Sequence, residues 1–476
     1  MTKRLKPMDA AWLYVDTKET PMHVGCMAIF SLPDDAPADF LVPLFAHLRA
    51  SQDFSPPFNL KLKNPRARLA PAWVEAERID LDYHLRHSAL PAPGGERELG
   101  VLISRLHSHP MDFKRPLWET HVIEGLRGPR GEARFALYMK MHHSLVDGVG
   151  GMRMLARMLS PDPAIANLPP PWTVGAGGAR ERKPAVGSQW QRFAEAARGQ
   201  LKTLPLVSRA LTRVVRESFK KTDPAEALPF SGPKSILNGP VSGQRRFATQ
   251  HYELARIKRV AQAAGVTVND VFLGLSAAAL RRYLLEIGAL PAQPLTAGVP
   301  VSVRPAGDEN VGNAISFIIA NLNTQLADPL QRLQAIRAST QIAKQHLQAL
   351  PAEALSPYTL LFMAPFILQL LAGRGGRGKP MFNVTISNVP GLDRVHYFNG
   401  ARLEQIYPVS LLSHGQALNI TVVSYAGQFN IGFTGCRDTL PSMQKLAVYT
   451  GEALEELERL LPAARAPGRK RSSEAA

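Results

Sequence analysis

Hydrophobic and polar positions alternate in two runs within the first third of the chain, His23–Phe30 and Arg134–His143. Successive side chains of a strand point to opposite faces, so this period predicts two strands with one face in a core. Helical periodicity fills the sequence between the two runs. The pattern over residues 1–166 therefore predicts an α/β lobe.

A stretch rich in proline and glycine follows this lobe. Residues 167–187 hold a triple proline and a cluster of glycines, a composition that favours no regular element. After it, Trp190–Lys221 places hydrophobic residues near helical spacing among many basic ones, and Pro205 should interrupt or kink the helix. We predict that residues 167–222 form a linker and a basic amphipathic helix.

The remaining sequence predicts a second α/β lobe over residues 223–461 and a disordered basic tail over residues 462–476. Short apolar runs indicate strands at Gln293–Val303, Asn313–Leu322, Phe382–Ser387 and Leu418–Val423. Longer periodic runs indicate helices at Val268–Glu286, Leu330–Leu347 and Pro441–Leu460. A chain of 476 residues exceeds one ordinary core, which agrees with two similar lobes.

Composition places the chain among folded proteins of a reducing compartment. Hydrophobic residues make up 45% and charged residues 20% of the chain. Its two cysteines, Cys26 and Cys436, form no CxxC pair, so we expect no structural disulfide. The start lacks the apolar core of a signal peptide, so we expect no secretion by that route. The most apolar stretch, Tyr358–Ala372, is shorter than the ~20 residues that cross a bilayer, which predicts at most peripheral membrane contact.

The excess of basic over acidic residues predicts an anionic binding partner. Lysine and arginine number 56 against 39 acidic residues, a formal charge of +17. Nucleic acid, an acidic membrane and a phosphate-bearing molecule such as coenzyme A all fit this excess. Aromatic residues are not interleaved with the basic runs, which weakens the nucleic-acid interpretation. The helix over Trp190–Lys221 suits an anionic membrane, but a solvated face packed through its apolar stripe explains it equally.

The sharpest chemical signal is the string Met141-His142-His143-Ser144-Leu145-Val146-Asp147-Gly148 at the end of the second strand. Strand alternation puts His143 on the apolar face and His142 on the other. A histidine at the end of an apolar face can act as a general base, because partial desolvation keeps it neutral near working pH. Two ordinary strand-end histidines are the alternative. The two rings diverge on a strand, so no shared metal site is predicted.

The residues after the two histidines suit this chemistry. Asp147 can hold the loop in place, and Gly148 lets backbone or substrate approach closely. No cysteine and no nucleophile-elbow serine stands at the motif, so we expect direct transfer of a group rather than a covalent enzyme intermediate.

The complete pattern, HHxxxDG, resembles the signature of the coenzyme A-dependent acyltransferase superfamily, which includes chloramphenicol acetyltransferase and the condensation domains of peptide synthetases. More closely, the chain resembles the bacterial wax ester synthase/diacylglycerol acyltransferase family over nearly its whole length. Further strings that carry this likeness are Pro7–Trp12, Thr20–Gly25, Pro116–Glu119, Val268–Asp270 and Asn388–Gly391. Their order and spacing together are specific, although the DFGWG-type motif of other branches is missing.

The resemblance implies two chloramphenicol-acetyltransferase-like α/β lobes, with the active site and a substrate tunnel at their interface. It implies an O-acyltransferase that moves a long acyl group from acyl-CoA to a fatty alcohol or a diacylglycerol, forming wax esters or triacylglycerol. Acyl-CoA is then a substrate, and no cofactor is expected.

The resemblance also implies roles for the residues of the motif. His143 would be the general base, and His142, Asp147 and Gly148 would belong to the catalytic group with it. Asn269 would lie near His143, where its amide could donate a hydrogen bond to the developing oxyanion.

Two further residues would orient the site. Asp270 would support its neighbour Asn269, although Thr267–Asp270 also fits a helix N-cap. Arg304 would pair with Asp147 and tie the lobes together, while a surface arginine at a strand end explains it equally.

Two rival functions stay open from the sequence. A condensation-type enzyme that takes its acyl group from a carrier protein, making amides or esters, would share His143. A basic coat protein without enzymatic activity is supported by charge alone. The acyltransferase interpretation predicts a cytoplasmic protein, peripheral to the inner membrane face or to lipid inclusions, with acyl-CoA and a lipid hydroxyl as partners and no nucleic acid.

Overall fold

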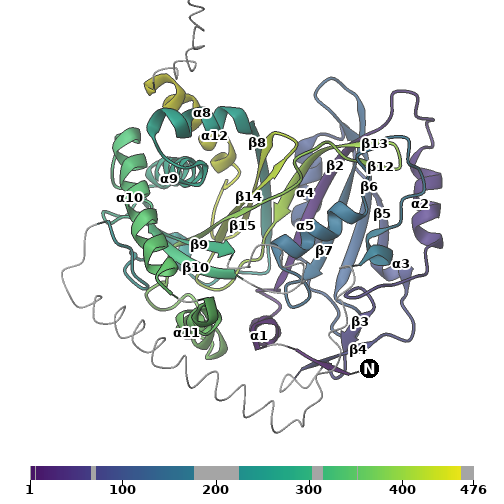
Figure 1. Cartoon of the computed structure of the whole chain (residues 1–476), viewed down its shortest axis with the longest axis horizontal. Helices are drawn as coiled ribbons and strands as arrows, with labels where there is room; N and C mark the ends of the chain where they lie inside the picture. Colours follow the sequence, from purple (N-terminus) through teal and green to yellow (C-terminus); the bar gives the residue numbers. More distant parts are fainter. Residues whose placement is uncertain are drawn as a thin grey trace, which may run out of the picture.

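Two six-stranded sheets form two α/β lobes that lie side by side (Figure 1). The computed structural model describes residues 2–5, 7–65, 71–175, 225–302, 315–350 and 352–461. This arrangement confirms the prediction of two α/β lobes.

Six strands build the sheet of the N-terminal lobe. In spatial order they are β12 (Tyr397–Phe398), β13 (Ala401–Val409), β2 (His23–Ser31), β7 (Ala133–His142), β6 (Trp118–Arg127) and β5 (Leu85–Ala89). Side chains of β7 alternate between two cores, as its sequence predicts. Phe135 and Leu137 lie in the core of the N-terminal lobe, whereas Ala136 and Tyr138 lie in a second cluster between the lobes.

Helices cover both faces of this sheet. In α4 (Glu96–Ser108), Leu99 and Ile103 join the cluster between the lobes, where they meet Phe247 of the C-terminal lobe. The other helices of this lobe are α1 (Pro7–Val15), α2 (Leu41–Ala50), α3 (Leu81–His84), α5 (Gly148–Arg157) and α6 (Pro171–Val174). A small separate sheet consists of β1 (Lys3–Arg4), β4 (Ala72–Glu75) and β3 (Leu60–Leu62).

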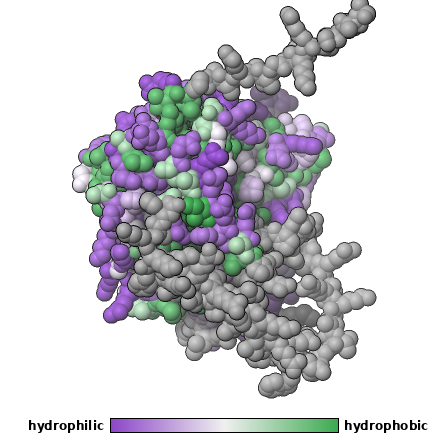
Figure 2. Space-filling view, turned by 60° about the vertical axis from the view of Figure 1, so that its left-hand side comes forward, coloured by the Kyte–Doolittle hydropathy of each residue, from purple (hydrophilic) through white to green (hydrophobic). Residues whose placement is uncertain are grey.

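The sheet of the C-terminal lobe carries its main helices on its outer side (Figure 1). Its strands, in spatial order, are β10 (Ile315–Asn321), β9 (Thr296–Ser302), β11 (Val384–Val389), β14 (Leu418–Tyr425), β15 (Gln428–Cys436) and β8 (Arg245–Glu253). Its helices are η1 (Ile236–Asn238), α8 (Leu254–Ala264), α9 (Val268–Glu286), α10 (Pro329–Gln348), α11 (Ala352–Leu371) and α12 (Lys445–Leu460). The largest hydrophobic core lies between this sheet and its helices. Seen from this side, the surface is largely hydrophilic, with small hydrophobic patches (Figure 2).

Helix α9 begins and ends at the residues that the periodicity predicts. Thr267 fixes its start, because its hydroxyl accepts a hydrogen bond from the Asp270 amide while the Asp270 carboxylate bonds back to Thr267. The other two predicted helices and all four predicted strands of this lobe are present, with ends that differ by up to four residues.

The predicted boundary of the C-terminal lobe is wrong for one segment. Strands β12 and β13 come from the second half of the chain but belong to the N-terminal sheet, where β13 pairs antiparallel with β2. Leu403 and Ile406 of β13 are buried in the core of the N-terminal lobe. By pairing with β2, strand β13 satisfies backbone hydrogen-bonding groups that would otherwise lie at an open edge of the N-terminal sheet.

The predicted linker is wrong for its first residues, because residues 171–174 form the short helix α6. The Trp172 side chain is fully buried, its ring stacks on Trp118 with centroids 5.5 Å apart, and its Nε1 donates to the Ser51 carbonyl. Burial of so large an aromatic surface stabilises order in a sequence otherwise poor in regular structure. The basic helix predicted at Trp190–Lys221 and the tail at residues 462–476 lie outside the described residues.

Within the part of the chain that the structure describes, no single helix is both long and apolar enough to cross a membrane. In the same described ranges, α8 and α9 pass that test only as a pair, and they are bent by 98°. The apolar stretch Tyr358–Ala372 lies in α11 except for its last residue, because the helix ends at Leu371.

Candidate active site

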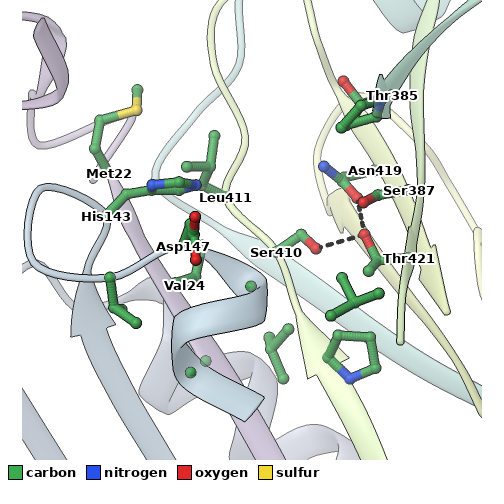
Figure 3. Close-up of a pocket in the computed structure, with 18 of the residues that line it drawn as sticks. Met22, Val24, His143, Asp147, Thr385, Ser387, Ser410, Leu411, Asn419 and Thr421 are labelled. Carbon is green, nitrogen blue, oxygen red and sulfur yellow. Dashed lines mark hydrogen bonds between the residues drawn. The ribbon is translucent and has the colours of Figure 1, made fainter. Parts of the chain in front are cut away.

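A cavity of about 320 Å³ lies between the two lobes and is lined mainly by hydrophobic side chains. The N-terminal lobe contributes residues of α1, β2, β7 and α5 to its wall. The C-terminal lobe contributes residues of α11, β11 and β14. His143 and Asp147 lie on one side of this space, opposite a group of polar side chains (Figure 3).

His143 is the first residue after β7, and its backbone is hydrogen-bonded to Met22, the residue just before β2. Its N–H donates to the Met22 carbonyl at 2.9 Å. Met139, Met141 and His143 all line the cavity, so the alternation of the strand continues one residue beyond its end. The prediction that His143 faces the same side as these apolar residues is confirmed.

The surroundings of the His143 ring keep it neutral. The Trp12 indole stacks on the ring, with centroids 4.3 Å apart and planes 21° apart. Burial lowers the pKa of His143 to about 4, although its own backbone carbonyl and Asp147 act in the opposite direction. Nδ1 is buried, which leaves Nε2 as the nitrogen available to a ligand. A neutral imidazole open to a cavity can accept a proton from a bound hydroxyl.

His142, which the sequence analysis included in the catalytic group, does not line the cavity. Its Nδ1 accepts hydrogen bonds from the Ser144 hydroxyl at 2.7 Å and from the Ser144 N–H at 3.2 Å. The protonated nitrogen is therefore Nε2, which lies 3.4 Å from a carboxylate oxygen of Asp16. These contacts give His142 a structural position and also occupy the Ser144 hydroxyl. Among the described residues, no three metal-binding side chains gather into a site.

Asp16 holds the backbone that carries His143. Its Oδ2 accepts a hydrogen bond from the Met22 N–H at 2.6 Å, and the Met22 carbonyl accepts the bond from the His143 N–H. The Asp16 side chain is buried together with the His142 ring that it faces. The sequence analysis assigned no role to Asp16, which lies between two of the strings that carry the family resemblance, or to Trp12, which ends the first of them. The contacts of Trp12 with His143 and of Asp16 with His142 connect segments far apart in the chain, so no local periodicity signals them.

Asp147 and Gly148 join the motif to the rest of the site. Asp147 is the N-cap of α5, and its Oδ1 accepts a hydrogen bond from the Gly150 N–H at 2.7 Å. This fits the predicted loop-holding role. A Cβ atom at Gly148 would lie 3.0 Å from Cγ2 of Val389, so the two lobes come into close contact here. A larger residue at position 148 would push β11 away from the motif.

The sequence matches two family models in succession. Residues 5–272 match the wax ester synthase/diacylglycerol acyltransferase catalytic domain, and residues 311–458 match the WS/DGAT C-terminal domain. The chain belongs to the wax ester synthase/diacylglycerol acyltransferase family. The resemblance inferred from its motifs is confirmed, and the protein is an acyltransferase.

Relatives named as O-acyltransferases align with nearly the whole chain. A putative diacylglycerol O-acyltransferase of Mycobacterium tuberculosis is 43% identical, covering 96% of this chain and 97% of the relative. O-acyltransferase WSD of Acinetobacter baylyi is 40% identical, covering 95% and 96%. The structure of a wax ester synthase/diacylglycerol acyltransferase from Marinobacter aquaeolei VT8 matches with a TM-score of 0.76 at 39% identity, covering 96% and 99%. A condensation domain of the calcium-dependent antibiotic synthetase shares the fold alone, with a TM-score of 0.60 at 17% identity, covering 98% and 97%.

Two residues that the family resemblance suggested lie away from the cavity in this wax ester synthase/diacylglycerol acyltransferase family member. Asn269 is in the first turn of α9 and does not line the cavity, so the structure does not bring it to His143. Asp270 is buried, where its carboxylate completes the N-cap and accepts a hydrogen bond from the Thr340 hydroxyl at 2.7 Å. The helix-cap alternative for Asp270 is confirmed. Arg304 lies outside the described residues, so its pairing with Asp147 stays a prediction.

Cys26 of β2 lines the cavity, which the sequence analysis did not anticipate. Desolvation raises the pKa of its thiol to about 12. The thiol therefore stays protonated at neutral pH, and a protonated thiol is a poor nucleophile. In this acyltransferase the cavity thus offers a neutral imidazole as base but no activated thiol.

Proposed function

We propose that the protein transfers a long acyl group from acyl-CoA to the hydroxyl of a fatty alcohol or a diacylglycerol, forming wax esters or triacylglycerol. The observation that carries this proposal is the neutral His143 imidazole on the wall of a mainly apolar cavity between the lobes. An apolar cavity suits an acyl chain and excludes the water that would compete as acceptor. The names of the relatives as wax ester synthases and diacylglycerol O-acyltransferases support the same substrates.

In the proposed reaction, Nε2 of His143 accepts the proton of the acceptor hydroxyl. At the same time the hydroxyl oxygen attacks the carbonyl carbon of the thioester. The carbon–sulfur bond then breaks, and the sulfur leaves with the electron pair and takes the proton back from His143. Asp147 holds the start of α5 beside the base, and Asp16 holds the backbone before it. The proposed reaction forms no covalent acyl-enzyme intermediate.

Direct transfer predicts that Cys26→Ala keeps acyl transfer within about threefold of wild type, because the thiol is protonated and takes no part in the chemistry. Initial rates with palmitoyl-CoA and hexadecanol would measure this. Treatment of the wild-type protein with iodoacetamide at neutral pH should likewise leave the rate unchanged. A loss of about 10²-fold in Cys26→Ala, together with an acyl adduct on Cys26 by mass spectrometry, would contradict direct transfer.

The donor separates this proposal from the carrier-dependent alternative. Purified protein is incubated with palmitoyl-CoA and either hexadecanol or a diacylglycerol, and the lipids are separated by thin-layer chromatography. Ester formed from palmitoyl-CoA supports the proposal, and the two acceptors distinguish wax ester from triacylglycerol synthesis. Activity with a palmitoyl-carrier protein and none with any acyl-CoA would instead favour the condensation-type reaction.

We also propose that the protein is cytoplasmic and contacts an anionic membrane or lipid inclusion. In α11, Phe366, Ile367 and Leu370 line the cavity, while Leu368 and Leu371 are 62% and 51% exposed. The loop after the helix exposes three basic side chains: Arg374, Arg377 and Lys379. A hydrophobic strip beside exposed cations suits an anionic lipid surface, and it adjoins the cavity that a lipid acceptor must enter.

This contact predicts salt-sensitive binding to anionic vesicles, because salt shortens the screening length from ~10 Å at 0.1 M. Sedimentation with neutral and anionic vesicles at low and high salt measures it. The double variant Arg374→Gln, Arg377→Gln should pellet less with anionic vesicles, whereas the matched pair Arg437→Gln, Arg459→Gln on other surfaces should pellet like wild type. Equal pelleting of wild type under all four conditions would exclude electrostatic binding.

A further inference from the structure

One wall of the mainly apolar cavity is polar, and strand pairing explains how. Strands β11 and β14 are parallel neighbours, with Thr385 opposite Asn419 and Ser387 opposite Thr421. All four residues line the cavity, while Ile420 between them is buried in the core of the C-terminal lobe. The alternation of the two strands therefore presents a strip of hydrogen-bonding side chains that faces His143 across the cavity (Figure 3).

The side chain of Asn419 is held in one orientation within this strip. The Thr421 hydroxyl donates to the Asn419 amide oxygen at 2.7 Å. Since that hydroxyl proton is used, the hydroxyl of Ser410, 2.9 Å away, donates to Thr421. Ser410 is fixed in turn, because its N–H donates to the Thr434 hydroxyl and its carbonyl accepts a bond from Nε2 of His107. This chain of bonds determines which end of the amide points where.

The amide nitrogen of Asn419 has no hydrogen-bond partner among the described residues. The oxygen is directed to Thr421, and Figure 3 shows the nitrogen on the side of Asn419 toward His143. The nitrogen can only donate hydrogen bonds, whereas a hydroxyl can rotate to donate or accept. A donor fixed before the substrate arrives stabilises a developing negative charge without reorganisation during the reaction.

We propose that the Asn419 side-chain amide donates a hydrogen bond to the carbonyl oxygen of the acyl thioester and stabilises the oxyanion formed there, with Thr421 and Ser410 as positioning residues. The inference rests on the proposed function. When the acceptor oxygen bonds to the carbonyl carbon, the carbonyl electron pair moves to its oxygen, which then accepts the Asn419 N–H. The pair returns to re-form the carbonyl, the carbon–sulfur bond breaks, and the thiolate takes the proton from His143.

The test compares Asn419→Leu with wild type, because leucine has a similar volume but no N–H. With palmitoyl-CoA and hexadecanol we expect kcat to fall by about 10²–10³-fold, while KM for palmitoyl-CoA changes by less than about threefold. Thr421→Val should lower kcat in the same direction by about tenfold, since the amide is then free to rotate. Thr421→Ser keeps the hydroxyl and should restore the rate. Thr249→Val, on β8 of the same sheet and away from the cavity, is the matched control and should behave as wild type.

Thermal unfolding of every variant identifies losses that come from misfolding, and the Thr421→Val and Thr421→Ser pair keeps the test decisive if Asn419→Leu does not fold. A raised KM with unchanged kcat would overturn the proposal, because Asn419 would then hold the donor in its ground state. An unimpaired kcat in Asn419→Leu with active wild type would contradict the oxyanion role alone. Wild type that transfers nothing from palmitoyl-CoA would contradict the proposed function and this role together.

Discussion

Replacement of His143 by alanine is expected to reduce acyl transfer by about 10²–10⁴-fold while the protein stays folded. The imidazole is the only titratable ring on the cavity wall in the part of the chain that the structure describes. Its N–H contact to Met22 is a backbone contact, so the substitution leaves that hydrogen bond in place. Initial rates with palmitoyl-CoA and either acceptor measure the loss, and circular dichroism with thermal unfolding measures the fold.

The adjacent histidine provides the matched control. His142→Ala should keep measurable transfer, because the ring of His142 does not reach the cavity. It should lower the melting temperature, since Ser144 and Asp16 lose a buried partner. If His143→Ala were active and His142→Ala inactive but folded, the base would be His142 and the assignment to His143 would be wrong.

Asp16→Ala is expected to lower kcat by about 10²-fold, although Asp16 does not touch the cavity. The change removes the acceptor of the buried Met22 N–H and the partner of His142. An unsatisfied buried donor costs about 1–3 kcal/mol of folding stability, so the melting temperature should also fall. The segment that holds the His143 backbone would then move, and small displacements of a catalytic group are costly. Steady-state rates and thermal unfolding measure both effects.

The isosteric variant separates positioning from charge. Asp16→Asn retains an oxygen that can accept from Met22, so it should recover most of the lost rate and stability. Asp53→Ala, at an exposed position of the same lobe, controls for removal of a carboxylate and should match wild type. If Asp16→Ala keeps full kcat with an unchanged melting temperature, Asp16 does not position the base.

The elements that the sequence predicts well depend on local signals. Helix α9 follows from its periodicity and from the Thr267 cap, both of which lie within the helix and its first turn. The face of His143 follows from strand alternation that begins eight residues earlier at Phe135. The family strings predict the two lobes because they mark segments of both.

The features that the sequence did not predict depend on distant partners. Strand β13 joins the N-terminal sheet because β2 offers an open edge, and nothing within residues 401–409 identifies that partner. Trp172 orders part of a proline-rich segment because its ring stacks on Trp118 and its Nε1 donates to the Ser51 carbonyl. Asn419 sits in a run that predicts merely a buried strand, and its neighbour Thr385 comes from a strand more than thirty residues away in sequence.

The dependence of kcat/KM on pH tests the central claim, that a desolvated neutral His143 is the base, most directly. A base acts in its unprotonated form, so kcat/KM should be constant from pH about 8 down to about 5. Because burial lowers the pKa of His143 to about 4, kcat/KM for palmitoyl-CoA should fall only toward that value, with circular dichroism at each pH to check that the protein is folded. The residual rate of His143→Ala should lack this ionisation. A midpoint at about 6.5 or higher, or the same midpoint in His143→Ala, would contradict the account.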